Sequence, residues 1–267
     1  MQYFSRERRK SLCVLYKSFI FAANLKHKNN MKAKNVIMAA VLLMTALTAN
    51  AQREVGTFTL QPKVGITVSN LTNSPSMSVG VASLSDENPG LMELSFNSTK
   101  EKVGLVAGFE AEYQMTRKLS ISAGLLYSMQ GAKYDDCDGV GISVTNAKTM
   151  LEYINIPIMA NFYIAKGLAL RAGLQPSFCV KNEAKADVAV RVDPDWTTYK
   201  AFVSCPNFNT FDLSIPVGAS YEYHDFVLGA TYNIGVTNVY GGTWDGGGKP
   251  TSHNSVFQVT LGYKFGL

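Results

Sequence analysis

Five charged residues of this chain of 267 residues stand within segments that otherwise alternate apolar and small polar residues. They are Lys63, Glu110, Glu112, Arg171 and Lys264. Each has the polar parity of its period-two segment, which predicts that all five project toward the same enclosed face of a sheet. Because buried charges are stable only when they are paired, the set predicts a structural ion network. The functional alternative is a path for protons or ions.

His253 and Ser255 are the residue types that could support nucleophilic catalysis, because a histidine base can activate a serine hydroxyl. Their H-x-S spacing is similar to that of outer-membrane lipid A 3-O-deacylases, in which the pair works with a glutamate. The stretches 234–252 and 64–73, which we expect beside the pair, contain no glutamate. The group that would orient the histidine is missing, so a histidine at the base of a loop is the favoured interpretation.

Cys137, Cys179 and Cys205 lie in or beside predicted long connections. An oxidising exterior permits a disulfide, and Cys179 to Cys205 is the favoured pair because it would close the base of one connection. The other pairings, and no disulfide at all, stay open. No second cysteine or histidine stands at ligand spacing, so we expect no metal and no cofactor.

The elements that position these residues are eight alternating segments. They span residues 58–69, 103–114, 119–130, 153–164, 168–181, 211–221, 226–237 and 256–265. In the second, one parity is Val103, Leu105, Ala107, Phe109, Ala111 and Tyr113, and the other carries Glu110 and Glu112. Period two indicates strands with different environments on their two faces. Eight is also the smallest common number of strands in a closed membrane barrel.

The two faces favour lipid outside the barrel. The polar face is rich in glycine, which weakens a strand unless the backbone is crowded, as in a narrow lumen. The apolar face has aliphatic residues in mid-strand and aromatic residues toward both rims, as in a lipid-facing band. The aromatic set is Tyr113, Tyr163, Tyr221, Tyr263 and Phe265 at one rim and Tyr127, Phe178, Phe211 and Phe257 at the other. We predict an all-β, eight-stranded antiparallel up-and-down transmembrane β-barrel with a filled polar lumen. A lipocalin-like soluble barrel is the alternative.

The N-terminal residues have the features of a secretory signal. We interpret residues 1–30 as a mis-called upstream start, 31–51 as the signal peptide and 52–267 as the barrel domain. Lys32 and Lys34 precede an apolar stretch, and Ala49-Asn50-Ala51 forms an A-x-A cleavage site. Nine of the 25 basic and one of the 20 acidic residues precede Gln52, which leaves 16 basic against 19 acidic residues. The mature chain is slightly acidic, so no nucleic-acid partner is expected.

The connections alternate in length. Short turns are predicted near 116–117, 165–166 and 223–224, and long loops at 72–100, 135–148, 183–206 and 239–252. Bacterial barrels have short periplasmic turns and long extracellular loops, so we expect both termini in the periplasm and four loops outside. In this arrangement Lys63 pairs with Glu110 and Glu112 from the adjacent strand, and Arg171 compensates the two glutamates from across the lumen.

Several short motifs resemble the PorT-type outer-membrane β-barrel domain family. They include Lys63-Val64-Gly65, Leu126-Tyr127-Ser128, Ile156-Pro157, Tyr232-Asn233 and the terminal Leu261-Gly262-Tyr263-Lys264-Phe265. The resemblance covers nearly all of the mature chain and implies an outer-membrane barrel of Gram-negative bacteria. Most members have no defined activity, and the namesake is tied to protein secretion across the outer membrane.

These observations favour a non-enzymatic integral outer-membrane protein. Its long loops would bind a partner, or it would support envelope assembly or secretion. The expected partners are outer-membrane lipid, the barrel-assembly machinery and an envelope or secretion protein. The alternatives are an enzyme that modifies outer-membrane lipid and a small-solute channel. The channel is disfavoured because side chains fill an eight-stranded interior.

Overall fold

The computed structural model describes residues 54–73, 77–82, 91–96, 99–139, 142–192, 195–204, 208–241 and 251–267. The chain divides into two compact units, Met1–Thr48 and Ala49–Leu267, and all described residues belong to the second. The predicted upstream start and signal peptide therefore lie outside the described residues.

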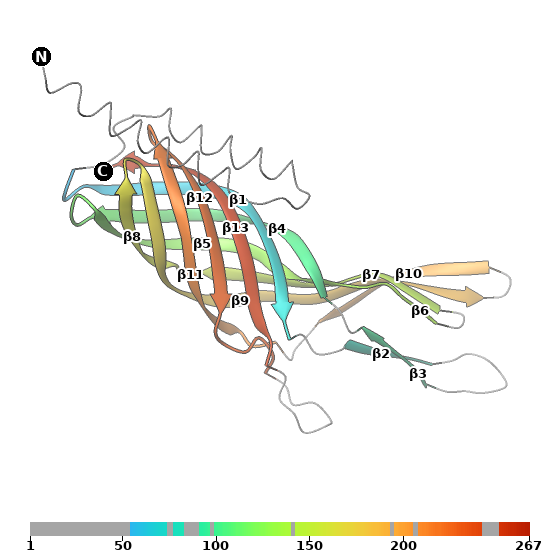
Figure 1. Cartoon of the computed structure of the whole chain (residues 1–267). Helices are drawn as coiled ribbons and strands as arrows, with labels where there is room; N and C mark the ends of the chain where they lie inside the picture. Colours follow the sequence, from blue (N-terminus) through green and yellow to red (C-terminus); the bar gives the residue numbers. More distant parts are fainter. Residues whose placement is uncertain are drawn as a thin grey trace, which may run out of the picture. The chain divides into compact units, whose positions relative to one another are not determined.

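The described part of the chain is built from antiparallel strands (Figure 1). They are β1 (Phe58–Thr72), β2 (Met77–Ala82), β3 (Leu91–Phe96), β4 (Thr99–Gln114), β5 (Leu119–Tyr134), β6 (Cys137–Gly139), β7 (Ile142–Asn155), β8 (Ile158–Ala165), β9 (Leu168–Val192), β10 (Asp195–Ser204), β11 (Phe211–Tyr223), β12 (Phe226–Gly235), β13 (His253–Tyr263) and β14 (Phe265–Gly266). Among the described residues, no helix has the length and apolar character needed to span a bilayer. The predicted all-β antiparallel architecture is confirmed.

Most strands pair with their neighbours in the chain. β1 pairs with β4, β4 with β5, and β5 with both β7 and β8. β7 and β8 both pair with β9, and the order continues through β11, β12 and β13 back to β1. We call the face enclosed by these pairings the interior. The short turns are where the sequence predicts them, between β4 and β5, β8 and β9, and β11 and β12.

A proline separates β7 from β8. Pro157 has no N–H to donate to a strand ladder, and the strand assignment stops at Asn155 and resumes at Ile158. Flanking hydrogen bonds keep the sheet continuous, since Gly124 N donates to Pro157 O at 2.9 Å and Ile156 N donates to Pro176 O at 2.9 Å. β7 and β8 therefore act together as one wall strand between β5 and β9.

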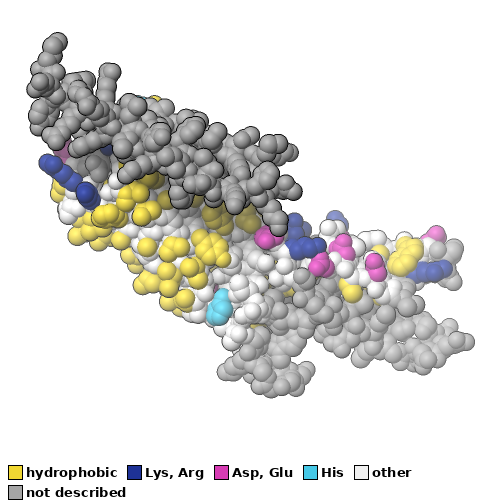
Figure 2. All heavy atoms as spheres, viewed as in Figure 1, with side chains coloured by type: hydrophobic (Ala, Val, Ile, Leu, Met, Phe, Trp, Pro, Cys, Tyr) yellow, Lys and Arg dark blue, Asp and Glu magenta, His cyan; other side chains and the backbone are white. Residues whose placement is uncertain are grey.

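Burial around the interior is inverted relative to a protein core in water. Phe109 and Leu125 are 57% and 56% exposed, whereas Thr67 and Ser120 are fully buried. Figure 2 shows hydrophobic side chains gathered over the outside of these strands. The predicted rim aromatics that are exposed are Tyr113, Phe178, Phe211, Phe257 and Phe265. Tyr163 is an exception, because it is only 5% exposed and points inward, so its predicted place in the aromatic girdle is wrong.

Side chains crowd the interior backbone, as at Gly262. A Cβ atom at this position would lie 2.2 Å from Nε2 of Gln61, which reaches across from β1. Toward the end of the strands nearest the long connections, the interior is apolar instead. Leu71, Ala132, Leu151, Tyr153, Phe208 and Val239 pack there as a buried cluster.

Two of the predicted long loops are strands. The sheet continues beyond the interior through four segments, which we call the extension. They are β6, residues 142–149 of β7, residues 182–192 of β9, and β10. Their apolar residues alternate as well, and Ile142 and Val144 form a small buried core with Val188 and Val190 packed against it. The prediction of loops at 135–148 and 183–206 is therefore wrong. In the loop predicted at 72–100, β2 and β3 form a separate hairpin.

Two irregularities in the β7–β9 ladder change which residues are buried. Tyr153 pairs with Cys179 and Glu152 with Lys181, so Val180 is an extra residue in β9. Before this bulge the buried residues of β9 have odd numbers, such as Arg171 and Ser177. After it they have even numbers, such as Ala184. A second slip lies at Asn146 of β7, which has a left-handed φ of 56°. An inserted residue shifts the parity of every following side chain.

Candidate functional site: the buried ion network

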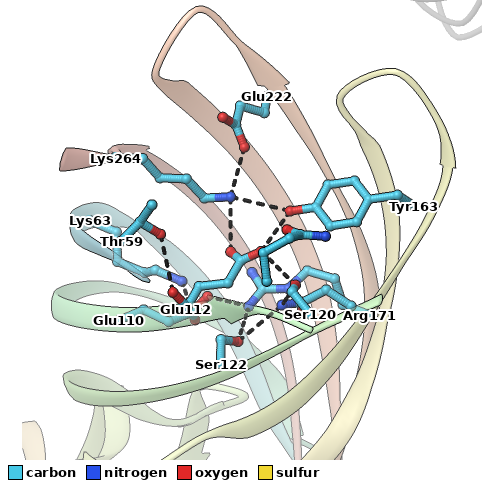
Figure 3. A network of polar contacts seen from close by, with 12 residues as sticks. Thr59, Lys63, Glu110, Glu112, Ser120, Ser122, Tyr163, Arg171, Glu222 and Lys264 are labelled. Carbon is cyan, nitrogen blue, oxygen red and sulfur yellow. Dashed lines mark hydrogen bonds and ion pairs between the residues drawn. The ribbon is translucent and has the colours of Figure 1, made fainter. Parts of the chain in front are cut away.

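Glu110 of β4 lies between two cations in the interior (Figure 3). Lys63 Nζ, from β1, is 2.6 Å from Glu110 Oε2, and Arg171, from β9, pairs with Oε1 of the same carboxylate. All three residues are at least 93% buried. Lys63 approaches Glu110 from β1, the strand next to β4. Arg171 belongs to β9 and reaches the same carboxylate from the other side of the interior.

Glu112 is the centre of a second group, two residues along the same face of β4. Lys264 Nζ lies 2.9 Å from Glu112 Oε2 and 2.7 Å from Glu222 Oε2 of β11. Tyr163 Oη and Ser120 Oγ each donate a hydrogen bond of 2.6 Å to Glu112 Oε1. Both oxygens of this buried carboxylate are therefore satisfied, as burial requires.

Neutral side chains join the two groups. Arg171 Nε donates to Asn161 Oδ1 at 2.8 Å, and Asn161 Nδ2 donates to Ser120 Oγ at 3.0 Å. Ser120 in turn donates to Glu112. The network contains three cations and three carboxylates, so its formal charges balance. Such pairing allows charged residues to remain in an interior that excludes most water.

The structure brings together all five predicted residues, and Lys63 and Arg171 pair with Glu110 as predicted. The predicted pairs with Glu112 are wrong. Glu112 forms its ion pair with Lys264, rather than with Lys63 or Arg171. Lys264 follows β13, the other neighbour of β1, between the pairs Lys63–Gly262 and Leu60–Phe265, and its side chain reaches Glu112 from there. Sequence analysis missed Glu222, Tyr163 and Asn161 as network members. The parity pattern could have found Glu222, which continues the polar face of the sixth segment by one step.

Above the network the interior is closed by further contacts. Asp212 accepts hydrogen bonds from Thr237 Oγ1 at 2.6 Å and from Asn254 Nδ2 at 2.9 Å, and the apolar cluster around Leu151 packs at the same end of the strands. A cavity of about 20 Å³, lined in part by Arg171 and Gln258, lies beside Glu110. That volume has room for about one water molecule.

His253 and Ser255 contact different groups. His253 Nδ1 lies 2.8 Å from the carbonyl oxygen of Thr237, and Ser255 Oγ lies 2.6 Å from Tyr232 Oη. The histidine thus contacts backbone at the start of β13, as expected for a residue at the base of a loop.

Cys137 and Cys179 form no disulfide with each other, and Cys179 Sγ donates to the carbonyl of Lys181 at 3.3 Å. Cys205 lies outside the described residues, so the Cys179–Cys205 disulfide stays a prediction. Within the described ranges, no three His, Cys, Asp or Glu residues are grouped so that they could hold a metal ion.

Comparison with known proteins points to one family. Residues 50–241 match the outer membrane protein beta-barrel domain. Ail, the attachment invasion locus protein of Yersinia pestis, is similar in structure at 13% identity and a TM-score of 0.35, with 79% of this chain and 100% of Ail covered. Neisserial surface protein A is similar at 12% identity and a TM-score of 0.37, with 78% of this chain and 97% of that protein covered. Outer membrane protease OmpT from Escherichia coli is similar at 12% identity and a TM-score of 0.36, with 79% of this chain and 97% of OmpT covered. No curated protein sequence matches the chain significantly.

Proposed function

The chain belongs to the outer membrane protein beta-barrel domain family, and from this premise we propose that it is a non-enzymatic barrel that presents its extension to a protein partner outside the cell. Family membership implies location in the outer membrane. The proposed barrel is eight-stranded and closed, with β7 and β8 counted as one strand, and its lumen is filled.

The observation that carries this proposal is the contrast between a filled interior and a structured, exposed extension. Three cations and three carboxylates pair inside the barrel, beneath the apolar cluster. The extension has an ordered core of its own, and its strand β10 exposes Trp196 and Tyr199 by 54% and 58%. Exposed aromatic residues are typical anchors of protein interfaces.

We place the termini and the short turns in the periplasm and the extension outside, as in bacterial barrels. Removal of residues 31–51 during export across the inner membrane of a Gram-negative cell is part of the same proposal. The resemblance to the PorT-type family makes a secretion or envelope-assembly protein one class of partner for the extension. The disfavoured alternatives are a lipid-modifying enzyme, for which His253 and Ser255 lack a common contact, and a channel, which the ion pairs across the interior would obstruct.

Site-specific photo-crosslinking on intact cells tests the proposal. A crosslinker at Tyr199 should capture a discrete protein partner, whereas one at Arg117, in the short turn after β4, should not capture the same protein. Recovery of that partner only from Arg117 would reverse the proposed orientation. Ion conductance of the wild-type protein in planar bilayers would instead favour the channel.

A further inference from the structure

Four lysines stand directly opposite one another across four neighbouring strands. Lys100 of β4 pairs with Lys133 of β5, Lys133 with Lys148 of β7, and Lys148 with Lys185 of β9. We call them the lysine row. Directly opposed residues project from the same face with Cβ atoms about 4.5–5.5 Å apart, and like charges in this arrangement repel. An anion bound along the row would remove that repulsion.

Carboxylates beside the row neutralise only its two ends. Asp135 pairs with Lys100 and, through a hydrogen bond, raises the pKa of that ammonium group. Glu183 lies 3.3 Å from Lys185, but it is shared with Lys181 at the same distance. Within the described part of the chain, the central Lys133 and Lys148 form no ion pair. The centre of the row therefore carries uncompensated positive charge.

The lysine row lies next to the apolar outer surface. Along β5 the outward parity runs through Ile121, Leu125 and Met129 before it reaches Lys133. Lys133 is four residues beyond Met129, roughly 13 Å along the strand. Figure 2 shows basic and acidic side chains gathered where the hydrophobic surface ends and the extension begins. In a membrane this level corresponds to the headgroup layer.

We propose that the lysine row binds the phosphate groups of an anionic lipid in the outer leaflet. This inference rests on the proposed function, which puts this end of the strands at the outer surface. Ammonium groups bind phosphate oxygens through charge-assisted hydrogen bonds. The acyl chains of the same lipid would pack against Val103 and Leu105 of β4, which follow Lys100 within five residues and are 64% and 57% exposed. A soluble polyanion would lack this second contact.

The test uses the mature chain in phosphatidylcholine vesicles with or without lipid A, a phosphorylated glycolipid. The double variant K133Q/K148Q keeps polar side chains at both positions and removes two charges. Its affinity for lipid A, measured as lipid retained after detergent extraction by mass spectrometry, should fall roughly 25-fold, because each lysine near an anionic surface contributes about a factor of five. In pure phosphatidylcholine the variant should resist urea better than wild type, because the repulsion between the two lysines is removed. Lipid A should reverse that order, because it stabilises the wild-type row by binding to it.

The matched control is K118Q/K166Q, which removes the same charge from the short turns at the opposite end of the strands. It should retain lipid A as wild type does, and equal loss from both variants would overturn the inference. Displacement of lipid A by inorganic polyphosphate at equal phosphate concentration would also overturn it, in favour of a soluble polyanion. A heat-dependent gel shift reports whether the protein has inserted as a folded barrel, and so separates the barrel proposal from the lysine-row proposal. Wild-type protein that fails to insert refutes the barrel, whereas inserted protein that retains no lipid A refutes only the lysine row.

Discussion

The strands around the interior and the extension use the same period-two pattern with opposite results. Val64, in β1, is 58% exposed, whereas Val144, in the part of β7 that belongs to the extension, is 1% exposed. Around the interior, buried positions are occupied by Thr67, Ser120 and charged residues, but in the extension they are occupied by aliphatic residues. Alternation alone therefore specifies a strand with two faces. The surrounding solvent, lipid or water, decides which face is turned inward.

The chain changes from one arrangement to the other within single strands. In β9 the extra residue Val180 moves burial from odd to even positions, and Asn146 makes the corresponding change in β7. Without these bulges, the apolar residues after Val180 would continue on the outer face in contact with water. The bulges thus mark the boundary between the two regions.

The largest expected effect comes from breaking the buried network. Arg171→Leu leaves Glu110 with one cation instead of two, and removal of one partner from a buried charge pair costs about 3–5 kcal/mol. The folded fraction, seen as the heat-modifiable band on gels, should fall. Adding Glu110→Gln should restore part of it, because the carboxylate charge is removed as well.

An exposed ion pair provides the control for that experiment. Asp135→Asn removes the partner of Lys100, whose side chain is 65% exposed, and should leave the heat-modifiable fraction unchanged. If Arg171→Leu is as stable as wild type, or if it opens an ion conductance, the interior is not a structural plug.

The second effect compares two exposed aromatic residues. Phe109 and Trp196 are 57% and 54% exposed, but only Phe109 lies on the strands around the interior. Phe109→Arg should cost about 2–4 kcal/mol if it faces the middle of a bilayer. Trp196→Arg should change folding in vesicles by no more than about 0.5 kcal/mol, as is usual for a water-exposed site. Equal costs in urea titrations would remove the distinction between the two surfaces.

The third effect tests the bulge at Asn146. Its left-handed φ of 56° costs a residue with a Cβ about 1–2 kcal/mol, whereas glycine adopts it freely. Asn146→Ala should therefore loosen the extension more than Asn146→Gly, although both lose the side-chain hydrogen bond to Asp187. Hydrogen exchange of the amides of β7 and β9 measures the difference, and faster exchange in the glycine variant would contradict this explanation.

The smallest effect is expected from Ile142→Val, which removes one methylene group from the core of the extension. Such a change costs about 0.5–1.5 kcal/mol. Amide exchange should accelerate at Val188 and Val190, while the strands around the interior stay protected. Acceleration throughout β4 and β5 would mean that the two regions unfold as one.

Sequence was sufficient for the strands around the interior because their two environments are chemically distinct along most of their length, as Phe109 and Glu110 illustrate. It fails at Tyr163, because the tendency of tyrosine to lie at membrane interfaces favours the girdle, whereas the polar parity of this residue predicts the interior. The predicted partners of Glu112, Lys63 and Arg171, are wrong, because contacts across the interior depend on how far neighbouring strands are staggered. The sequence predicts a loop at 183–206 although Val188 and Val190 alternate, because the parity change at Val180 interrupts the period-two pattern.

The uninterrupted length of β9 has a mechanical consequence. Its 25 residues extend over roughly 80 Å and pair with β11, β8 and β7 along one part and with β7 and β10 along the rest. Tension applied at the tip along the strand axis would load many backbone hydrogen bonds in parallel, in shear, rather than opening them one after another. A partner that pulls on the extension would therefore transmit force directly into the barrel wall.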